Sequence, residues 1–311
     1  MLRNRYSSYG EWLKRRFGGP VYKVSVDGGF TCPNRDGTVA RGGCTYCSND
    51  SFRALGVGAG KPVRQQIEEG IRFLSSRFDP RMFIVYWQHY TNTHGELETL
   101  RSRFEESLGV DDRIVGIAIG TRADCVEQPK LEMIRELARE KFVCLEYGLE
   151  SARDETLERI NRGHDFARYV EAVERTHALD LPVCAHVILG FPWESLSQML
   201  EGAATLNRLG IDFVKVHHLH VLGNTALGQE YLRRPFKTFS LEEWVALVCD
   251  FIELLAPAIV IQRLFGWAPE HDLLAPRWGV HKSVVLQHIK NELVRRDSWQ
   301  GKELGAARPE E

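Results

Sequence analysis

Short apolar segments alternate with longer amphipathic segments along most of the chain. Val21–Asp27 alternates apolar with polar residues and is rich in β-branched side chains, as expected for a strand. Five further apolar runs have the length and composition of buried strands: Met82–Trp87, Ile114–Ile119, Phe142–Leu149, Pro182–Leu189 and Phe213–Val221. Apolar residues at helical spacing predict helices at Lys61–Arg77, Leu97–Leu108, Lys130–Glu140, Asp154–Ile160, Phe166–Leu179, Leu196–Leu209 and Leu241–Leu255.

Six strands that are each followed by a helix predict a parallel sheet. No glycine-rich phosphate turn follows the first strand, so we favour a barrel over a dinucleotide-binding fold. The predicted fold class is α/β: a partial (β/α)6 TIM-type barrel with parallel strands and extensions at both ends. We assign residues 1–20 to a basic N-terminal extension, 21–256 to the barrel, 257–300 to a C-terminal extension that packs on the barrel, and 301–311 to a disordered tail. Residues 259–266 are a candidate seventh strand.

The composition is that of an ordinary globular protein, with 43% hydrophobic and 26% charged residues. The formal net charge of −2 gives no global electrostatic field of the kind that marks a nucleic-acid-binding protein. The sequence shows neither a signal peptide nor an apolar run of about 18 residues, so we expect a cytoplasmic protein without a membrane partner. Thiols stay reduced in that compartment, and clustered cysteines there indicate metal binding rather than disulfides.

The N-terminal extension combines basic and aromatic residues, which allows two interpretations. It is either an amphipathic helix docked on the barrel or a local patch that contacts phosphates and stacks on bases. The residues concerned are Arg3, Arg5, Tyr6, Tyr9, Trp12, Lys14, Arg15 and Arg16.

A loop rich in Gly, Asn and Asp follows the first predicted strand and carries Cys32, Cys44 and Cys47, spaced C-x11-C-x2-C. Thiolates are ligands for iron–sulfur clusters, zinc or copper(I). A structural zinc site normally has four ligands, whereas three cysteines on a 4Fe–4S cluster leave one iron open to a substrate or second cofactor. Tyr46 lies between the last two cysteines, where its ring could shield the cluster or stack on a ligand. Zinc with a distant histidine as fourth ligand is the alternative, and His217, His218 and His220 are its best candidates.

Polar residues gather where the other predicted strands end, at the edge of the sheet where barrel enzymes place their chemistry. The run from Gln88 to His94 offers amides and hydroxyls that could hold an amino or carboxylate group. Arg122 and Asp124 could bind a charged ligand or pair with each other. Strand alternation places His218 and His220 on one face, and on an inward face they would be proton donors or substrate contacts. They are our candidate catalytic residues.

These segments together resemble the radical S-adenosylmethionine (SAM) superfamily, and more closely its YhcC/YtqA-like family, which is related to the elongator catalytic subunit. The usual superfamily motif is C-x3-C-x2-C, and the wider C-x11-C-x2-C spacing is itself a mark of this family. The matching segments are RYSSYGEWLKRRFGGPVYKVSVDGGFTCPNRDGT, YTNTHG, GTRADC, YGLES, INRGHD, ILGFPWE and HLHVLGNTAL. The resemblance covers roughly residues 5–300.

The resemblance implies that Cys32, Cys44 and Cys47 ligate a 4Fe–4S cluster whose free iron is chelated by SAM. One-electron reduction would then cleave SAM to methionine and a 5′-deoxyadenosyl radical, which takes a hydrogen atom from the substrate. By motif position, Gln88, Thr91 and Asn92 stand where the superfamily has Gly-Gly-Glu for the SAM amino group. The remaining implied SAM contacts are Tyr46, Glu150 for the ribose, Arg162 for the carboxylate, and Ile188 with Gly190 for the adenine.

One branch of this family is associated with tRNA wobble-uridine modification, converting 5-carboxymethylaminomethyluridine to 5-aminomethyluridine. That resemblance implies tRNA as the substrate, an electron donor such as flavodoxin or ferredoxin, and a separate downstream tRNA methyltransferase. Two alternatives remain open from the sequence. One is a radical SAM enzyme acting on a small metabolite or peptide, and the other is a non-catalytic, zinc-stabilised RNA-binding module.

Overall fold

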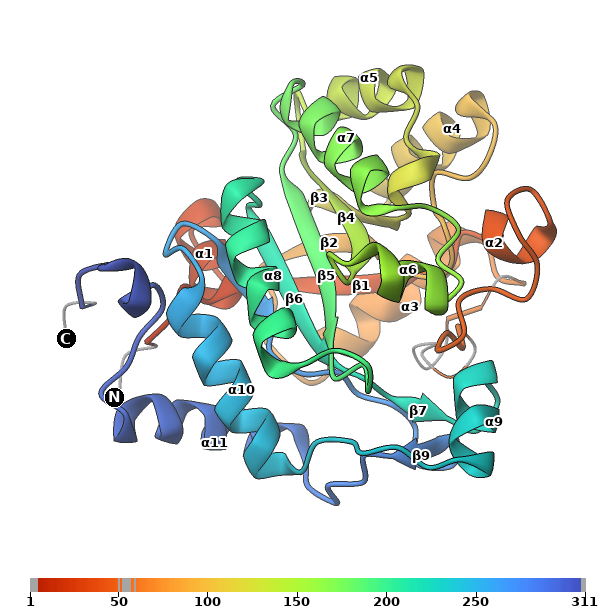
Figure 1. The fold of residues 1–311 in the computed structure, drawn as a ribbon. Helices are drawn as coiled ribbons and strands as arrows, with labels where there is room; N and C mark the ends of the chain where they lie inside the picture. The colour runs from red at the N-terminus through yellow and green to blue at the C-terminus, as the bar shows by residue number, and fades with distance from the viewer. Residues whose placement is uncertain (1–4, 50, 52–56, 59, 309–311) are drawn as a thin grey trace.

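A curled parallel sheet dominates the computed structural model, which describes residues 5–49, 51, 57–58 and 60–308 (Figure 1). Its seven strands lie in the order β1-β2-β3-β4-β5-β6-β8, and every neighbouring pair is parallel. The strands are β1 (Val21–Val26), β2 (Met82–Trp87), β3 (Ile114–Thr121), β4 (Phe142–Glu150), β5 (Val183–Leu189), β6 (Phe213–His218) and β8 (Val260–Arg263). The predicted partial barrel is confirmed, and the candidate strand at residues 259–266 supplies its seventh strand.

Helices cover the convex face of the sheet (Figure 1). They are α3 (Val63–Ser75), α4 (Leu97–Leu108), α5 (Gln128–Leu137), α6 (Asp154–Arg159), α7 (Phe166–His177), α8 (Leu196–Arg208) and α10 (Leu241–Leu254), with α11 (Lys282–Arg295) packed on α10. Alternation along β2 explains the layering. Phe83, Val85 and Trp87 are buried in the core beneath the helices, whereas Ile84 and Tyr86 belong to a second cluster on the concave face.

Helix α1 (Tyr9–Phe17) closes the amino-terminal end of the concave face. The Trp12 ring lies 4.9 Å from the ring of Phe213 and 5.5 Å from that of Phe142, and both phenylalanines begin strands. Tyr9 is buried in the same cluster. The helix is therefore docked on the barrel, and its packed aromatic rings are not available to stack on bases.

The chain departs from the predicted pattern after β6, because the backbone turns where the alternation of the sequence continues. Val221–Leu222 forms β7, which pairs antiparallel with β9 (Leu273–Ala275) in a separate small sheet. Helix α9 (Ala226–Arg233) follows β7 and has no counterpart in the prediction. The backbone N–H of Leu219 donates to the carbonyl of Leu189 at 2.9 Å, which fixes this turn against β5.

The tail that was predicted to be disordered contains ordered residues in its described part. Lys302–Leu304 form a 3-10 turn, η3, and the indole N–H of Trp299 donates to the carbonyl of Ala306 at 2.9 Å. Residues 309–311, also predicted to be disordered, lie outside the described residues. Across the part of the chain that the structure describes, no helix is both long and apolar enough to span a bilayer.

Candidate functional site

A cavity of about 260 Å³ opens at the carboxyl ends of the strands, where the cysteine loop follows β1. The residues singled out from the sequence that line it include Cys32, Cys44, Tyr46, Cys47, Gln88, Thr91, Arg122, Glu150, Arg162, Ile188, His217, His218 and His220. Segments far apart in the sequence thus converge on one space. The cavity lies at the strand ends that the barrel prediction assigned to the chemistry.

Two predicted SAM contacts do not line this cavity. Asn92 is fully buried, and its side-chain amide donates to the carbonyls of Trp87 at 3.1 Å and Gly120 at 2.8 Å. It therefore ties the loop after β2 to β3. Gly190 has a φ of +110° and faces Phe239, whose ring would lie 3.2 Å from an added Cβ. Gly190 lines a different cavity, between the end of β5 and helices α8 and α10. Their roles toward SAM stay predictions.

Backbone and side-chain bonds hold the cysteine loop to the barrel. The N–H of Thr45, next to Cys44, donates to the carbonyl of Ile160 at 2.9 Å, and the N–H of Leu227 donates to the carbonyl of Thr45 at 2.8 Å. The side-chain amide of Asn161 donates to the carbonyl of Gly43 at 2.9 Å. The cysteines are thus positioned by elements that follow β4 and β6, which explains how an irregular loop can present ligands in a fixed arrangement.

N–H donors surround the cysteine sulfurs. The side-chain amide of Asn34 lies 3.6 Å from Cys44 Sγ, that of Asn49 lies 3.7 Å from Cys47 Sγ, and Arg162 Nη1 lies 3.8 Å from Cys44 Sγ. Such donors stabilise thiolates and tune the potential of an iron–sulfur cluster. Without a metal, burial raises the pKa of Cys47 to about 12, so the thiol would release its proton on binding one.

The spacing of the three cysteines argues against a single ion. Among the described residues, the group of three potential metal ligands whose ligand atoms all lie within 4.8 Å of one another is Glu146, Cys184 and His186. Cys32, Cys44 and Cys47 do not form such a group. Zinc–sulfur bonds of about 2.3 Å would bring all three sulfurs closer together than this. A larger cluster, which separates its ligands, suits the arrangement better.

Glu150 and Arg162 form a buried ion pair beside Cys44, with 3.8 Å between Arg162 Nη2 and Glu150 Oε1. Burial raises the pKa of Glu150, against the opposing effect of Arg162. Glu150 is also one of few non-glycine residues with positive φ, at 65°, a strained conformation of the kind found at functional sites. A carboxylate held in this way can accept hydrogen bonds from a ribose diol.

Two arginines keep unused donors in the cavity wall. Arg122 makes a bidentate pair with Asp124, at 2.8 and 2.7 Å, so these residues do pair with each other. However, Nη1 of Arg122 and Nε of Arg162 are buried and have no hydrogen-bond partner within the described ranges. Buried unpaired donors are costly, and a carboxylate or another anionic group would satisfy them. The unpaired donors of these two arginines are therefore suited to bind the carboxylate of SAM.

The predicted catalytic histidines line the cavity and pack against aromatic rings. The ring of His218 lies 4.2 Å from the ring of Trp278 and 5.3 Å from that of Trp244, beneath α10. The ring of His220 lies 4.1 Å from that of His218. Burial lowers the pKa of His220 to about 4, so the ring is neutral near pH 7. Their assignment as catalytic residues stays a prediction.

The sequence interpretation missed most of a polar layer at the cavity, which we call the barrel floor; only His217 of this layer was singled out, as a candidate zinc ligand. Its cavity-lining members are Tyr86 on β2, Glu146 on β4, His186 on β5, His217 on β6 and Arg263 on β8. Lys215 of β6 completes it through contacts with Tyr86 and Glu146, and Lys23 of β1 contacts Glu146 beside it. Period-two alternation along β5 and β6 was the available signal, because Cys184, His186 and Ile188 share a face, as do Lys215 and His217.

The comparisons with known proteins agree with this site. The family model described as the radical SAM superfamily matches residues 34–224, and the model of the radical SAM C-terminal domain matches residues 211–295. The chain is 37% identical to the uncharacterised protein YtqA of Bacillus subtilis, over 96% of this chain and 92% of YtqA. It is 34% identical to the protein YhcC of Escherichia coli, over 89% of this chain and 88% of YhcC.

Two more distant similarities concern archaeal proteins. The tRNA uridine(34) acetyltransferase of Methanocaldococcus infernus is 25% identical over 139 residues, which are 44% of this chain and 26% of that protein. The solved structure of M. infernus Elp3 with its N-terminus deleted superposes with a TM-score of 0.68 at 18% identity, covering 90% of this chain and 64% of that one. At this identity the structural likeness shows the fold alone.

The superfamily match covers more than half of the chain, and two relatives above 30% identity cover nearly all of it. Members of this superfamily use a 4Fe–4S cluster together with SAM, and the cysteine loop and the unpaired arginine donors described above suit both groups. The chain therefore belongs to the radical SAM superfamily, in the group that contains YtqA and YhcC.

Proposed function

We propose that this radical SAM enzyme modifies the wobble uridine of tRNA, converting 5-carboxymethylaminomethyluridine to 5-aminomethyluridine. The observation that carries the radical chemistry is the single cavity that joins Cys32, Cys44 and Cys47 to Glu150 and Arg162. The tRNA assignment draws support from the partial similarity to a tRNA uridine(34) acetyltransferase and from the shared fold with Elp3.

In this proposal the three cysteines hold the cluster, and the cavity wall next to them holds SAM. Glu150 accepts hydrogen bonds from the ribose, while Arg162 and Arg122 offer their unused donors to the carboxylate. When bound together, the two cofactors supply a carbon radical that removes a hydrogen atom from a substrate. The protein binds and orients the groups and shields them from water, since Cys44, Arg122 and Arg162 are buried and the other side chains are half-buried.

The carboxymethylamino group of the proposed substrate is suited to the removal of a hydrogen atom. The methylene of a carboxymethylamino group lies between an amine nitrogen and a carboxylate, and both neighbours stabilise a carbon radical at that position. Its hydrogen is therefore easier to remove than those of an ordinary alkyl group. The electron that activates the cofactors would come from an electron donor such as flavodoxin or ferredoxin, and the product amine would pass to a tRNA methyltransferase.

A second candidate is a radical SAM enzyme that acts on a small metabolite or peptide. The formal net charge of −2 favours it, because an RNA substrate is usually matched by an excess of basic residues. The zinc-stabilised RNA-binding module is disfavoured by the family and by the spacing of the cysteines.

The test is mass spectrometry of tRNA nucleosides from a strain that lacks the gene, beside its parent and a complemented strain. We expect 5-carboxymethylaminomethyluridine to accumulate and the nucleosides derived from 5-aminomethyluridine to be lost. Complementation by the wild-type gene should restore the parent pattern, and a gene carrying Cys44→Ala should not. Unchanged wobble nucleosides, in a host without a parallel route to the same product, would favour the second candidate instead.

A further inference from the structure

Strand register brings basic side chains into one row across the barrel floor. Gly148 of β4 is paired with His186 of β5, His186 with Lys215 of β6, and Lys215 with Arg263 of β8. His217, two residues beyond Lys215, faces the cavity above this row, and its ring lies 5.8 Å from that of His186. His186 and Arg263 of this row line the cavity that also holds the cysteines and Glu150, and Lys215 lies between them in the strand register.

Positive charge exceeds negative charge in this layer. Glu146 is fully buried at its centre and accepts from Lys23 at 2.7 Å, from His186 at 2.9 Å and from Lys215. Glu146 is the floor's one carboxylate, and Lys215, Lys23 and Arg263 all carry positive charge around it. Burial lowers the pKa of His186 to about 4 and that of His217 well below its usual value, so both rings are neutral. The floor therefore holds more cations than its own carboxylate can balance.

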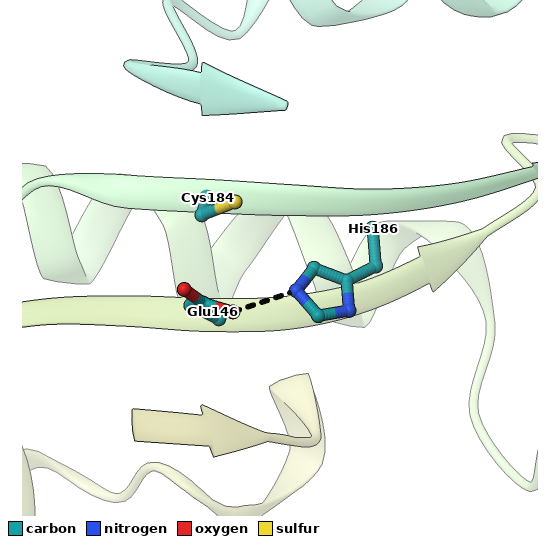
Figure 2. Close-up of side chains that lie close together, drawn as sticks. All are labelled: Glu146, Cys184 and His186. Carbon is teal, nitrogen blue, oxygen red and sulfur yellow. Dashed lines mark hydrogen bonds and ion pairs between the residues drawn. The ribbon is translucent and has the colours of Figure 1, made fainter. Parts of the chain in front are cut away.

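A second metal site is the first interpretation to exclude. Glu146, Cys184 and His186 lie close enough together to hold an ion, and Figure 2 shows the imidazole of His186 directed at the carboxylate of Glu146. Lysine ammonium groups, however, already contact both oxygens of that carboxylate. Burial also raises the pKa of the Cys184 thiol, which keeps it protonated and a poor ligand. A metal cation would add charge to a layer that already has an excess.

Several donors in the floor remain available to a ligand. Nε2 of His217 is buried and has no hydrogen-bond partner in the described part of the chain. The ammonium of Lys215 contacts the Tyr86 hydroxyl at 3.0 Å and Glu146, which leaves one of its three N–H groups. No hydrogen bond or ion pair joins the side chain of Arg263 to another residue that the structure describes, although this side chain lines the cavity. These groups share one chemistry, which is the donation of hydrogen bonds to an anion.

We propose that the barrel floor binds a carboxylate of the substrate, with Lys215, Arg263 and His217 as the donors. A carboxylate at the end of a short, unbranched side chain can accept hydrogen bonds from all three donors. Its binding would hold the adjacent carbon above the floor, toward the cysteine side of the cavity. Where the arm is the carboxymethylamino group of a wobble uridine, this inference rests on the proposed function. The binding of a carboxylate by the floor does not depend on RNA.

The lysine supports this assignment. Burial lowers the pKa of Lys215 to about 8, and the partial opposing effect of Glu146 does not restore it. An anion placed beside the ammonium would raise that pKa again, so binding of the carboxylate and protonation of Lys215 favour each other. Charge-assisted hydrogen bonds of this type contribute about 1.5–3 kcal/mol each, which corresponds to roughly ten-fold or more in affinity.

The test measures dissociation constants by fluorescence anisotropy with the reconstituted, SAM-loaded enzyme. Two labelled anticodon stem-loop RNAs are compared, which differ only in whether the wobble arm ends in a carboxylate or in the isosteric carboxamide. We expect the wild type to prefer the carboxylate by at least about ten-fold. Arg263→Gln and Lys215→Met should each reduce that preference to about three-fold or less, whereas the control Arg208→Gln, on the exposed end of α8, should retain it.

The outcomes separate the two proposals. If the carboxylate preference persists in both variants, the floor is not the carboxylate site, although the RNA assignment stands. If the wild type binds neither modified RNA better than one with plain uridine, the RNA assignment is wrong. The floor is then tested by thermal shift with N-methylglycine against its amide: stabilisation by the acid alone, lost in Arg263→Gln, supports the site. Equal effects of acid and amide overturn it. Because Arg263 is exposed, its variant remains informative if Lys215→Met fails to fold.

Discussion

Cys44 is a predicted cluster ligand whose sulfur is in contact with neighbouring donors. It is buried, the Asn34 amide and the Arg162 guanidinium both contact its sulfur, and Thr45 beside it is bonded to two other segments. Cys249 is equally buried but lies in α10, where its sulfur contacts the carbonyl of Ile289 at 3.7 Å. The two cysteines therefore form a matched pair, one on the cavity and one in the helical core.

Replacing Cys44 with alanine should remove most of the iron. The reconstituted wild type should carry about four irons per chain with matching sulfide, as expected for one 4Fe–4S cluster. Cys44→Ala removes a ligand and should lose the brown colour, whereas Cys249→Ala should keep full iron content and be destabilised by about 1 kcal/mol or more. Iron and acid-labile sulfide analysis measures this. Full iron in Cys44→Ala would show that the ligand assignment is wrong.

Glu146 illustrates the difference between buried and exposed charge. Burial alone would raise the pKa of its carboxyl, but Lys215, Lys23 and His186 together outweigh burial and hold that pKa well below its usual value. Glu136, by contrast, is paired with Arg101 at 2.7 Å on the exposed surface between α4 and α5. The same type of ion pair should therefore have very different effects on stability at the two positions.

We expect Glu146→Gln to lower the free energy of unfolding at pH 7 by about 3–5 kcal/mol, because it leaves buried lysines without their counter-charge. Glu136→Gln should change it by about 1 kcal/mol or less. The pKa of Glu146 is lower in the folded than in the unfolded state, so its contribution is present above the unfolded pKa and lost as the pH falls. In urea denaturation, the difference in free energy of unfolding between the wild type and Glu146→Gln should thus shrink as the pH is lowered. A difference in free energy of unfolding that stays constant with pH would show that the ionised carboxylate of Glu146 is not its cause.

At the scale of elements, Gly70 lets helix α3 approach strand β1. A Cβ added at Gly70 would lie 2.5 Å from Val24 Cγ1, a distance that real side chains do not tolerate. Gly202 on α8 offers a control, because its Cβ would lie 3.7 Å from the Phe251 ring, an ordinary contact. Helix propensity favours alanine over glycine at both positions by about 1 kcal/mol. The local packing therefore decides whether a glycine-to-alanine change stabilises or destabilises the protein.

Gly70→Ala should destabilise the protein by about 1–3 kcal/mol through overpacking, and Gly202→Ala should be neutral or stabilising. Removing the opposing methyl groups tests the cause. Val24→Ala alone creates a cavity and destabilises the protein. The double variant with Gly70→Ala should lose less free energy of unfolding than the two single variants lose together. Chemical denaturation of the four proteins completes the cycle. Additive effects would mean that the clash with Val24 is not the reason for the glycine.

The elements were predictable where the periodicity of the sequence and the path of the backbone agree. Strands β1 to β5 lie close to the predicted bounds because each apolar run is bounded by polar residues. The split between β6 and β7 was not predictable, since the apolar and polar alternation continues through Leu219 to Val221 while the backbone turns. β9 pairs with a segment some 50 residues away, and pairing over such a distance leaves no local pattern in the sequence.

The site was predictable in part for a related reason. Cys32, Cys44 and Cys47 are visible because their spacing is compact in sequence, and Glu150 and Arg162 because they follow strand ends. The barrel floor was missed because Lys215 and His186 lie within strands, where a single polar residue resembles one on a solvent-facing edge. Only the curling of the sheet turns their face inward, toward Glu146.

At the scale of the whole molecule, the basic helix α1 and the cavity lie at opposite ends of the barrel. Helix α1 packs its aromatic residues into the amino-terminal end and leaves Lys14, Arg15 and Arg16 exposed there. The cavity opens at the opposite end, where Trp267 lines it with 63% of its surface exposed. The basic residues of α1 and the cavity mouth therefore face different regions of solvent.

This separation predicts which surface an RNA substrate contacts. Exposed charges are screened over about 8–10 Å at physiological salt, so replacing Lys14, Arg15 and Arg16 together with glutamate should change the affinity for an anticodon stem-loop by about two-fold or less. Trp267→Ala should weaken it by about ten-fold, because an exposed ring at the cavity mouth can stack on a base next to the wobble position. Anisotropy titrations at 0.05 and 0.15 M salt would measure both, again with Arg208→Gln as the control. The reverse result, a large loss from α1 and none from Trp267, would place the RNA along the amino-terminal end. The wobble uridine could then not reach the cysteines from that contact, and the proposed modification of the wobble uridine would be wrong.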